Sequence, residues 1–166
     1  RNLDFREHCV VLAPHTIHPA VSLRLLKALG EKAVCYSEGS SAINSQAGVL
    51  ILDTIGLLTR VYSYAALAYV GGGFATGLHN TLEPAVFGIP VIIGPHYQGF
   101  REAEDLVRHG GLLPVDSAAA FEAVATGLLT KPEKRLLLGQ ANAHHIKQSA
   151  GASGQILRGI GALLKP

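Results

Sequence analysis

The sequence contains few charged residues. Of its 166 residues only 16% are charged, the formal net charge at pH 7 is +2, and no dense cluster of lysine and arginine occurs. Nucleic-acid-binding proteins usually carry a basic patch, and anionic membrane surfaces attract polybasic segments. We therefore expect no nucleic-acid partner, and no membrane contact through this part of the protein.

Cysteine is also scarce, because only Cys9 and Cys35 occur. Both lie in apolar segments typical of strands and not at metal-ligand spacing, so we predict two buried free thiols and a reducing compartment. His109, His144 and His145 have no carboxylate or cysteine partner at zinc spacing, and we expect them to be solvated.

Two phosphate-chemistry motifs are missing as well. The sequence has neither a Gly-x-x-x-x-Gly-Lys-Ser/Thr loop nor an Asp-x-Asp pair, which argues against kinase-like and metal-bridged phosphate chemistry. No hydrophobic run is long enough to cross a bilayer and no signal peptide is visible, so we expect a soluble chain. Because it begins at Arg1 directly before a strand pattern, we expect a piece of a longer protein.

Short β-rich runs alternate with helical runs along the chain, which predicts an α/β fold. We expect a single domain over 1–166: a Rossmann-like parallel sheet of about six strands with helices on both faces, and terminal helices within 132–164. Strands are predicted over 9–13, 33–36, 49–52, 67–70 and 112–115, with one more just before Gly94. Helices are predicted over 18–29, 57–66, 101–108, 117–130, 132–145 and 153–164, with one more starting near Asn80 or Thr81.

The segment from Tyr69 to Pro95 is the most informative part of the sequence. Its strand ends in three glycines, 71–73, whose missing Cβ atoms let the main chain turn sharply and approach a ligand. The helix that starts near Asn80 offers unpaired N–H groups to an anion such as phosphate. Glu83, in its first turn, can accept hydrogen bonds from the two hydroxyls of a ribose. In the alternative interpretation, the glycines serve packing and Glu83 only stabilises the helix.

Ligands of open α/β sheets bind beyond the carboxyl ends of the strands, so two other loops are also candidates. His15 and Thr16 follow the first strand, where an imidazole can contact a base edge or a phosphate. The alternative is a solvated loop in which Thr16 caps the next helix. In the loop at 55–57, Gly56 permits close backbone approach and Ile55 and Leu57 offer apolar contact to a flat base. A plain helix entry capped by Thr54 is the alternative there.

The motif His79-Asn80-x-Leu82-Glu83-Pro84, followed by Phe87-Gly88-x-Pro90-Val91 and Gly94-Pro95, resembles one family of GT-B glycosyltransferases. That family is the 3-deoxy-D-manno-octulosonic acid (Kdo) transferases of lipopolysaccharide synthesis. The resemblance covers roughly the first two thirds of the chain. Further agreements are Ala13-Pro14-His15, Tyr36-Ser37, Asp53-Thr54-Ile55-Gly56-Leu57-Leu58 and Phe100-Arg101-Glu102-Ala103.

The resemblance implies that the chain is the carboxy-terminal, donor-binding half of an inverting transferase. Such an enzyme moves Kdo from CMP-Kdo to a lipid A precursor without a metal or other cofactor, at the cytoplasmic face of the inner membrane of a Gram-negative bacterium. The amino-terminal half would carry the general base, the acceptor surface and the membrane contact, so no catalytic residue is expected here and the isolated chain should be inactive. The implied nucleotide-binding residues are His15, Thr16, Ile55, Gly56, Leu57, Asn80, Thr81, Leu82 and Glu83.

Two residues depart from the family pattern. Family members often have an arginine where His15 stands, so a titratable ring would make donor binding sensitive to pH or leave the phosphate to other groups. Many have an acidic residue where Leu57 stands, so that contact must be made here by backbone or by van der Waals interaction. Two other functions remain open: the same half of a UDP-sugar transferase or epimerase, and a non-catalytic nucleotide-binding module.

Overall fold

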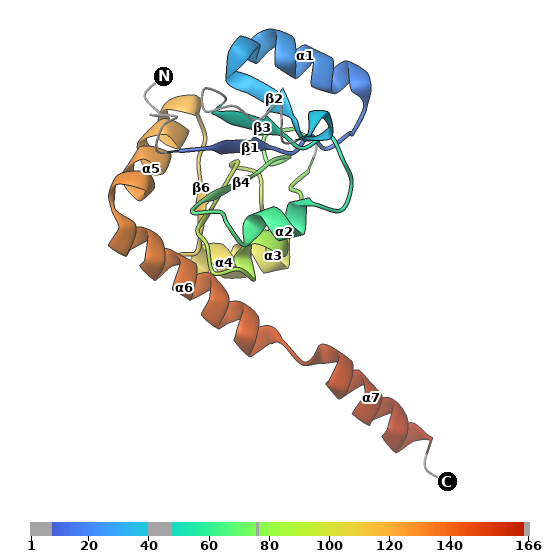
Figure 1. Ribbon diagram of the computed structural model, residues 1–166. Helices are drawn as coiled ribbons and strands as arrows, with labels where there is room; N and C mark the ends of the chain where they lie inside the picture. The colour runs from blue at the N-terminus through green and yellow to red at the C-terminus, as the bar shows by residue number, and fades with distance from the viewer. Residues whose placement is uncertain (1–7, 40–47, 76, 165–166) are drawn as a thin grey trace. The chain divides into compact units, whose positions relative to one another are not determined.

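The computed structural model describes residues 8–39, 48–75 and 77–164, and strands and helices alternate along it (Figure 1). The strands are β1 (Val10–Leu12), β2 (Ala33–Cys35), β3 (Val49–Ile51), β4 (Ala68–Val70), β5 (Val91–Ile93) and β6 (Leu112–Pro114). The helices are α1 (Pro19–Leu29), α2 (Leu58–Tyr62), α3 (Leu82–Ala85), α4 (Arg101–Arg108), α5 (Ala118–Thr130), α6 (Pro132–Ser149) and α7 (Ala152–Leu163). Two 3₁₀ turns, η1 (Gly30–Lys32) and η2 (Tyr36–Glu38), flank β2.

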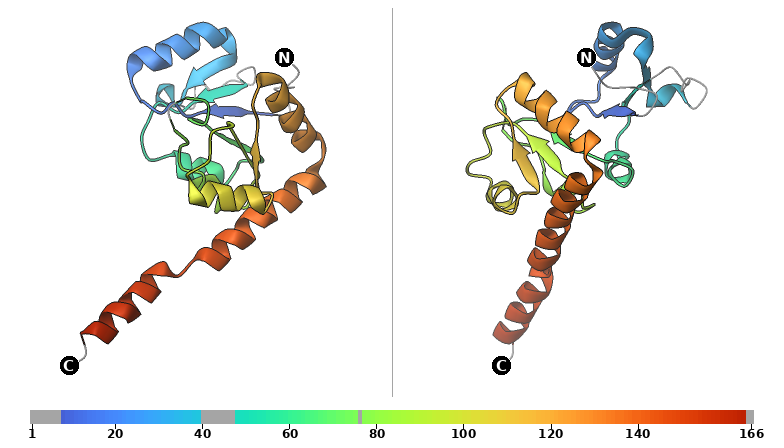
Figure 2. Two further views of the ribbon diagram at one scale, coloured as in Figure 1. Left: turned by 180° about the vertical axis from the view of Figure 1, so that it is seen from behind. Right: turned by 90° about the vertical axis from the view of Figure 1, so that its left-hand side faces the viewer.

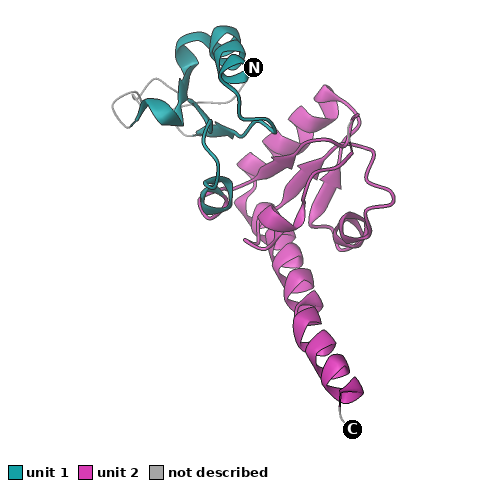
Figure 3. Ribbon diagram, turned by 90° about the vertical axis from the view of Figure 1, so that its right-hand side faces the viewer, with its two compact units in different colours: residues 1–61 teal, residues 62–166 magenta. Residues whose placement is uncertain are grey.

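The chain forms two compact units, 1–61 and 62–166 (Figure 3). Each unit contains a three-stranded sheet, with strand order β1-β3-β2 in the first and β4-β5-β6 in the second. All strand pairs are parallel. The predicted α/β class with parallel strands is therefore confirmed, and the six strands are divided between two small sheets.

Unit 1 is built around β3, whose Val49 and Ile51 are buried. Leu25, Leu26 and Leu29 of α1 pack against this core, because they lie on one face of an amphipathic helix. The helix begins after His18, whose Nδ1 accepts a hydrogen bond from the N–H of Ala20 at 3.2 Å. The cap is thus His18, and the alternative of a cap at Thr16 is wrong.

Unit 2 is built around β5, whose three residues are fully buried. Ala103 and Leu106 of α4 join Val91 and Ile93 in the core on one face of the sheet. On the other face, Phe121 of α5 meets Tyr69 of β4 edge to face, with ring centroids 5.5 Å apart. Figure 2 shows α4 and α5 on opposite sides of this sheet, so the predicted cover on both faces is confirmed for unit 2.

Several predicted boundaries were wrong. The helix predicted over 57–66 is the single short turn α2, and the predicted helix at Thr81 is only four residues long before the chain turns at Gly88, where φ is +67°. The helix predicted over 132–145 continues to Ser149. Cys35 is buried as predicted, whereas Cys9 lies just before β1 and is exposed.

Two searches of the described residues found nothing. None of their helices combines the length and apolarity that a membrane span requires. They also include no group of three or more His, Cys, Asp or Glu side chains arranged to hold a metal ion. His109 and His144 are exposed, as predicted, whereas His145 is half-buried; the rings of His109 and His145 are in contact, with centroids 4.6 Å apart.

Candidate functional site

Backbone hydrogen bonds to two glycine carbonyls hold the loop after β4 in a tight turn. The N–H of His79 donates to the carbonyl of Gly71 at 3.1 Å, and the N–H of Ala75 donates to the carbonyl of Gly72 at 3.1 Å. Gly72 has φ +91°, and a Cβ there would lie 2.0 Å from the carbonyl oxygen of Gly77. This position therefore requires glycine both for its dihedral angle and for space.

The loops after β4 and β5 touch each other at their backbones. A Cβ on Gly94 would lie 2.5 Å from the carbonyl carbon of Gly73, and a Cβ on Gly73 would lie 3.0 Å from the Cα of Gly94. The N–H of His96 donates to the carbonyl of Gly73 at 2.9 Å. Gly73 and Gly94 thus fix one loop against the other, so the packing interpretation of the glycines holds for this pair.

Asn80 organises the start of α3. Its Oδ1 accepts a hydrogen bond from the N–H of Leu82 at 3.0 Å, and its Nδ2 donates to Oε1 of Glu83 at 3.1 Å. Glu83 is half-buried and lies in the first turn of the helix, as predicted. Thr81 is the N-cap residue and is buried, with 2% of its surface exposed.

Glu83 also acts electrostatically on a neighbouring side chain. The pKa of Tyr62 is raised by burial and, to a smaller extent, by the negative charge of Glu83. Tyr62 in turn contacts Phe87, with ring centroids 6.2 Å apart. Sequence reasoning did not identify this aromatic pair.

The predicted anion site at the helix start needs a correction. A macrodipole is the sum of aligned peptide dipoles, and α3 provides only one turn of them. Its dipole is correspondingly small. The hydrogen-bonding side chains at this point, Asn80 and Glu83, are therefore the stronger basis for a site.

In unit 1 the ends of β2 and β3 are joined by a polar pair. Asp53 accepts hydrogen bonds from the N–H of Ser37 at 3.0 Å and from the Ser37 hydroxyl. Burial acts to raise the pKa of Asp53, but the hydrogen bonds from Ser37 outweigh it and the pKa is lowered. Burial raises the pKa of the Cys35 thiol, and the charges of Asp53 and Glu38 add to this.

Asp53 leads directly into the predicted loop at 55–57. Ile55 is 88% exposed, Gly56 has φ +88°, and Leu57 is half-buried. The Thr54 hydroxyl is buried and has no hydrogen-bond partner within the part of the chain that the structure describes, so the prediction that Thr54 caps the next helix is wrong. The loop presents an apolar side chain and a glycine to its surroundings.

The predicted site residues form three local groups. Asn80, Thr81, Leu82 and Glu83 make one turn of unit 2 at the carboxyl edge of its sheet. Ile55, Gly56 and Leu57 follow β3 in unit 1, and His15 and Thr16, both exposed, follow β1. Each group lies beyond the carboxyl end of a strand, where parallel sheets bind ligands.

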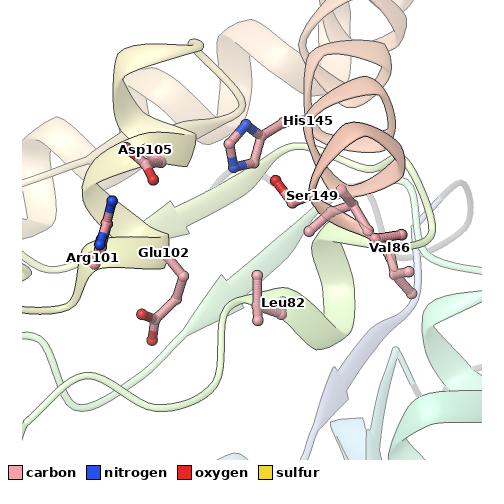
Figure 4. A pocket seen from close by; sticks show the side chains of 9 residues that line it. Leu82, Val86, Arg101, Glu102, Asp105, His145 and Ser149 are labelled. Carbon is pink, nitrogen blue, oxygen red and sulfur yellow. The ribbon is translucent and has the colours of Figure 1, made fainter. Parts of the chain in front are cut away.

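A groove of about 470 Å³ lies next to the α3 group. It is bordered by α3, α4 and α6, and Figure 4 shows its side chains. Leu82, a predicted site residue, shares the groove with Val86, Arg101, Glu102, Asp105, His145, Ile146, Ser149 and Ala150. Its lining is largely apolar, with charged side chains from α4 on one side.

Comparisons with known proteins connect this geometry to a family. No protein-family model matches the sequence. A 3-deoxy-D-manno-octulosonic acid transferase of Haemophilus influenzae is 37% identical over 126 residues, which are 74% of this chain and 29% of the relative. The corresponding transferase of Chlamydophila psittaci is 38% identical over 130 residues, 76% of this chain and 29% of the relative. The chain thus spans about three tenths of the length of these curated relatives.

A solved structure agrees with the sequence relatives. The crystal structure of the C-terminal CMP-Kdo binding domain of WaaA from Acinetobacter baumannii matches with a TM-score of 0.74 and 26% identity. The match covers 86% of this chain and 75% of that domain. The similarity in sequence and the similarity in fold therefore agree that this chain resembles the Kdo transferases, in the part that corresponds to their carboxy-terminal domain.

Proposed function

We propose that this chain binds CMP-Kdo as the donor-binding half of an inverting glycosyltransferase that moves Kdo to a lipid A precursor. The observation that carries the proposal is the similarity, over 86% of the chain, to a solved domain described as binding CMP-Kdo. The local geometry supports it, because a half-buried carboxylate stands at the carboxyl edge of a parallel sheet with one oxygen already held by Asn80.

In this proposal Glu83 binds the ribose. A carboxylate accepts hydrogen bonds only, and its two oxygens together offer about four lone-pair sites. One of these sites on Oε1 is taken by Asn80. The remaining capacity suits two neighbouring hydroxyls, as on a ribose. We keep His15, Thr16, Ile55, Gly56 and Leu57 as proposed nucleotide contacts of unit 1.

The remaining steps of the reaction are assigned to other parts of the protein. We propose that donor binding needs no metal or other cofactor, and that the general base, the lipid acceptor surface and the membrane contact belong to an amino-terminal half. The full-length enzyme would then act at the cytoplasmic face of the inner membrane, while the present chain alone binds CMP and transfers nothing.

The test is calorimetry of the chain with CMP, comparing wild type with Glu83→Ala. Loss of hydrogen bonds to a charged group costs about 1–3 kcal/mol, so we expect affinity to fall about 5- to 150-fold. Glu122→Ala is the matched control, because Glu122 is an exposed carboxylate on α5, away from the α3 turn. Equal affinity of the Glu83→Ala variant and wild type would reject the ribose role.

The choice of nucleotide separates CMP-Kdo from a UDP-sugar donor. A ligand that binds only the folded state raises the melting temperature by an amount that grows with the logarithm of the ratio of its concentration to its Kd. We expect CMP to raise the melting temperature more than UDP does at equal concentration. A larger shift with UDP would favour the UDP-sugar alternative.

A further inference from the structure

We infer that Asn80 is a positioning residue, which holds the Glu83 carboxylate in the orientation that receives the ribose. The inference rests on the proposed function, because it assigns a task to Asn80 within the same site. It departs from the sequence-based prediction, in which Asn80 is a direct nucleotide contact.

Both the oxygen and the nitrogen of the Asn80 side-chain amide form hydrogen bonds. Its Oδ1 accepts from the N–H of Leu82 at 3.0 Å, which fixes the side chain to the first turn of α3. Its Nδ2 donates to Oε1 of Glu83 at 3.1 Å. The first bond orients the amide, so the second bond places the carboxylate at a defined point relative to the helix start.

This arrangement reduces the entropy that ligand binding must remove. A glutamate side chain has three rotatable bonds, and immobilising such a side chain in a complex weakens binding by about 2- to 12-fold. Asn80 restricts the Glu83 side chain in the free protein. Part of the side-chain entropy that binding would otherwise remove is therefore already lost before the ligand binds. The expected contribution of Asn80 to affinity is therefore of this size.

The charge of Glu83 acts on one aromatic side chain, Tyr62. Tyr62 lies near enough for the Glu83 charge to contribute to its raised pKa, and Tyr62 packs against Phe87. The two bonds use only one of the two N–H groups of Asn80 Nδ2. A direct contact of the second N–H would act on the phosphate and not through Glu83, so the two roles are separable by experiment.

The experiment compares CMP with 2′,3′-dideoxy-CMP, which keeps the base and the phosphate but lacks both ribose hydroxyls. For Asn80→Ala we expect the affinity for CMP to fall about 2- to 12-fold and the affinity for the dideoxy analogue to stay unchanged. Asn80→Asp keeps an acceptor for the N–H of Leu82 but cannot donate to Glu83, so the ratio of the two affinities should change in the same direction. In a Glu83→Ala background neither substitution should alter that ratio.

The possible outcomes separate the inference from the proposed function. Equal weakening of both ligands by Asn80→Ala would show a direct contact to phosphate or base and overturn the inference. An Asn80→Ala variant with wild-type affinity for CMP, beside a weakened Glu83→Ala variant, would overturn the inference and leave the proposed function intact. A wild-type chain that binds no CMP, or a Glu83→Ala variant that binds it fully, would remove the proposed function and the inference with it.

Discussion

Asn142 of α6 is the polar side chain on which the packing of unit 2 most depends. It is fully buried, and its Nδ2 donates to the carbonyl of Ile89 at 2.8 Å and to the carbonyl of Gly111 at 3.0 Å. These two carbonyls precede β5 and β6, so one amide joins a helix to the amino-terminal ends of two strands. We predict that Asn142→Ala lowers the free energy of unfolding.

The size of the change in unfolding free energy depends on which hydrogen bonds the two carbonyls keep in the Asn142→Ala variant. The carbonyl of Gly111 also accepts from the N–H of Val91 at 3.1 Å, so its loss is one ordinary hydrogen bond of about 0.5–1.5 kcal/mol. The carbonyl of Ile89 loses the Asn142 donor in a buried position, which costs about 1–3 kcal/mol. The higher helix propensity of alanine offsets part of this loss. So does removal of the buried Oδ1 of Asn142, which has no hydrogen-bond partner among the described residues. We expect a net decrease of about 2 kcal/mol.

Urea unfolding followed by circular dichroism at 222 nm measures this difference. Thermal unfolding should show a decrease in Tm of about 4–8 °C for a chain of this size. Gln140→Ala, on the exposed side of the same helix, is the control and should change the free energy by less than about 0.5 kcal/mol. An Asn142→Ala variant within that same margin of wild type would refute the reasoning.

A double mutant tests the geometry itself. A Cβ on Gly111 would lie 1.8 Å from Oδ1 of Asn142, so Gly111→Ala should be strongly destabilising in the wild-type background. In the Asn142→Ala background the same methyl group has room, and the two changes together should cost less than their sum. Simple additivity of the two free-energy changes would contradict the close contact.

Three further predictions concern other sites. Native protein should react with a thiol reagent at the exposed Cys9 but slowly at Cys35, because burial raises the pKa of the Cys35 thiol; denatured protein should react at both, as mass spectrometry would show. Gly94→Ala should be strongly destabilising and should weaken CMP binding, because its Cβ would lie 2.5 Å from the backbone of the preceding loop; calorimetry and urea unfolding check this. The lowered pKa of Asp53 stabilises the fold above the pKa of the unfolded chain, and this stabilisation is lost as the pH falls through the lower folded value. Ser37→Ala should therefore reduce the difference in urea midpoint between pH 7 and pH 3, and an unchanged difference would refute the role of the Ser37 hydrogen bonds.

The order of strands and helices could be predicted because it depends on local signals. Alternating apolar runs, Pro19 after a capping residue and Gly30 at a helix end are all visible in adjacent residues. The length of α3 could not be read in this way, because Gly88 and the packing of α6 end the helix. A Cβ on Gly139 of α6 would lie 2.0 Å from the carbonyl oxygen of Gly88, so this contact is made across 51 residues of sequence.

The contacts of Asn142 are even harder to predict from local sequence. Its two partners are 53 and 31 residues away, and nothing in the pattern of α6 distinguishes this amide from an exposed one. The hydrogen bond between Asn80 and Glu83 spans three residues at a helix start, which is a spacing that a sequence can reveal. We predicted both as site residues but did not predict the bond between them.

The polar contacts at the strand ends are harder to predict than local signals and easier to predict than the contacts of Asn142. They follow from the register of paired strands and not from residues adjacent in sequence. Cys35 pairs with Ile51, so the residues two positions beyond each strand end are Ser37 and Asp53, and these two are hydrogen-bonded. The same rule works in unit 2: Val70 pairs with Ile93, and three positions beyond them the carbonyl of Gly73 accepts from the N–H of His96. Parallel strands thus carry their register a few residues into the loops that follow. Had the register been known, both contacts could have been predicted from sequence, so strand register is the specific information that the motifs lacked.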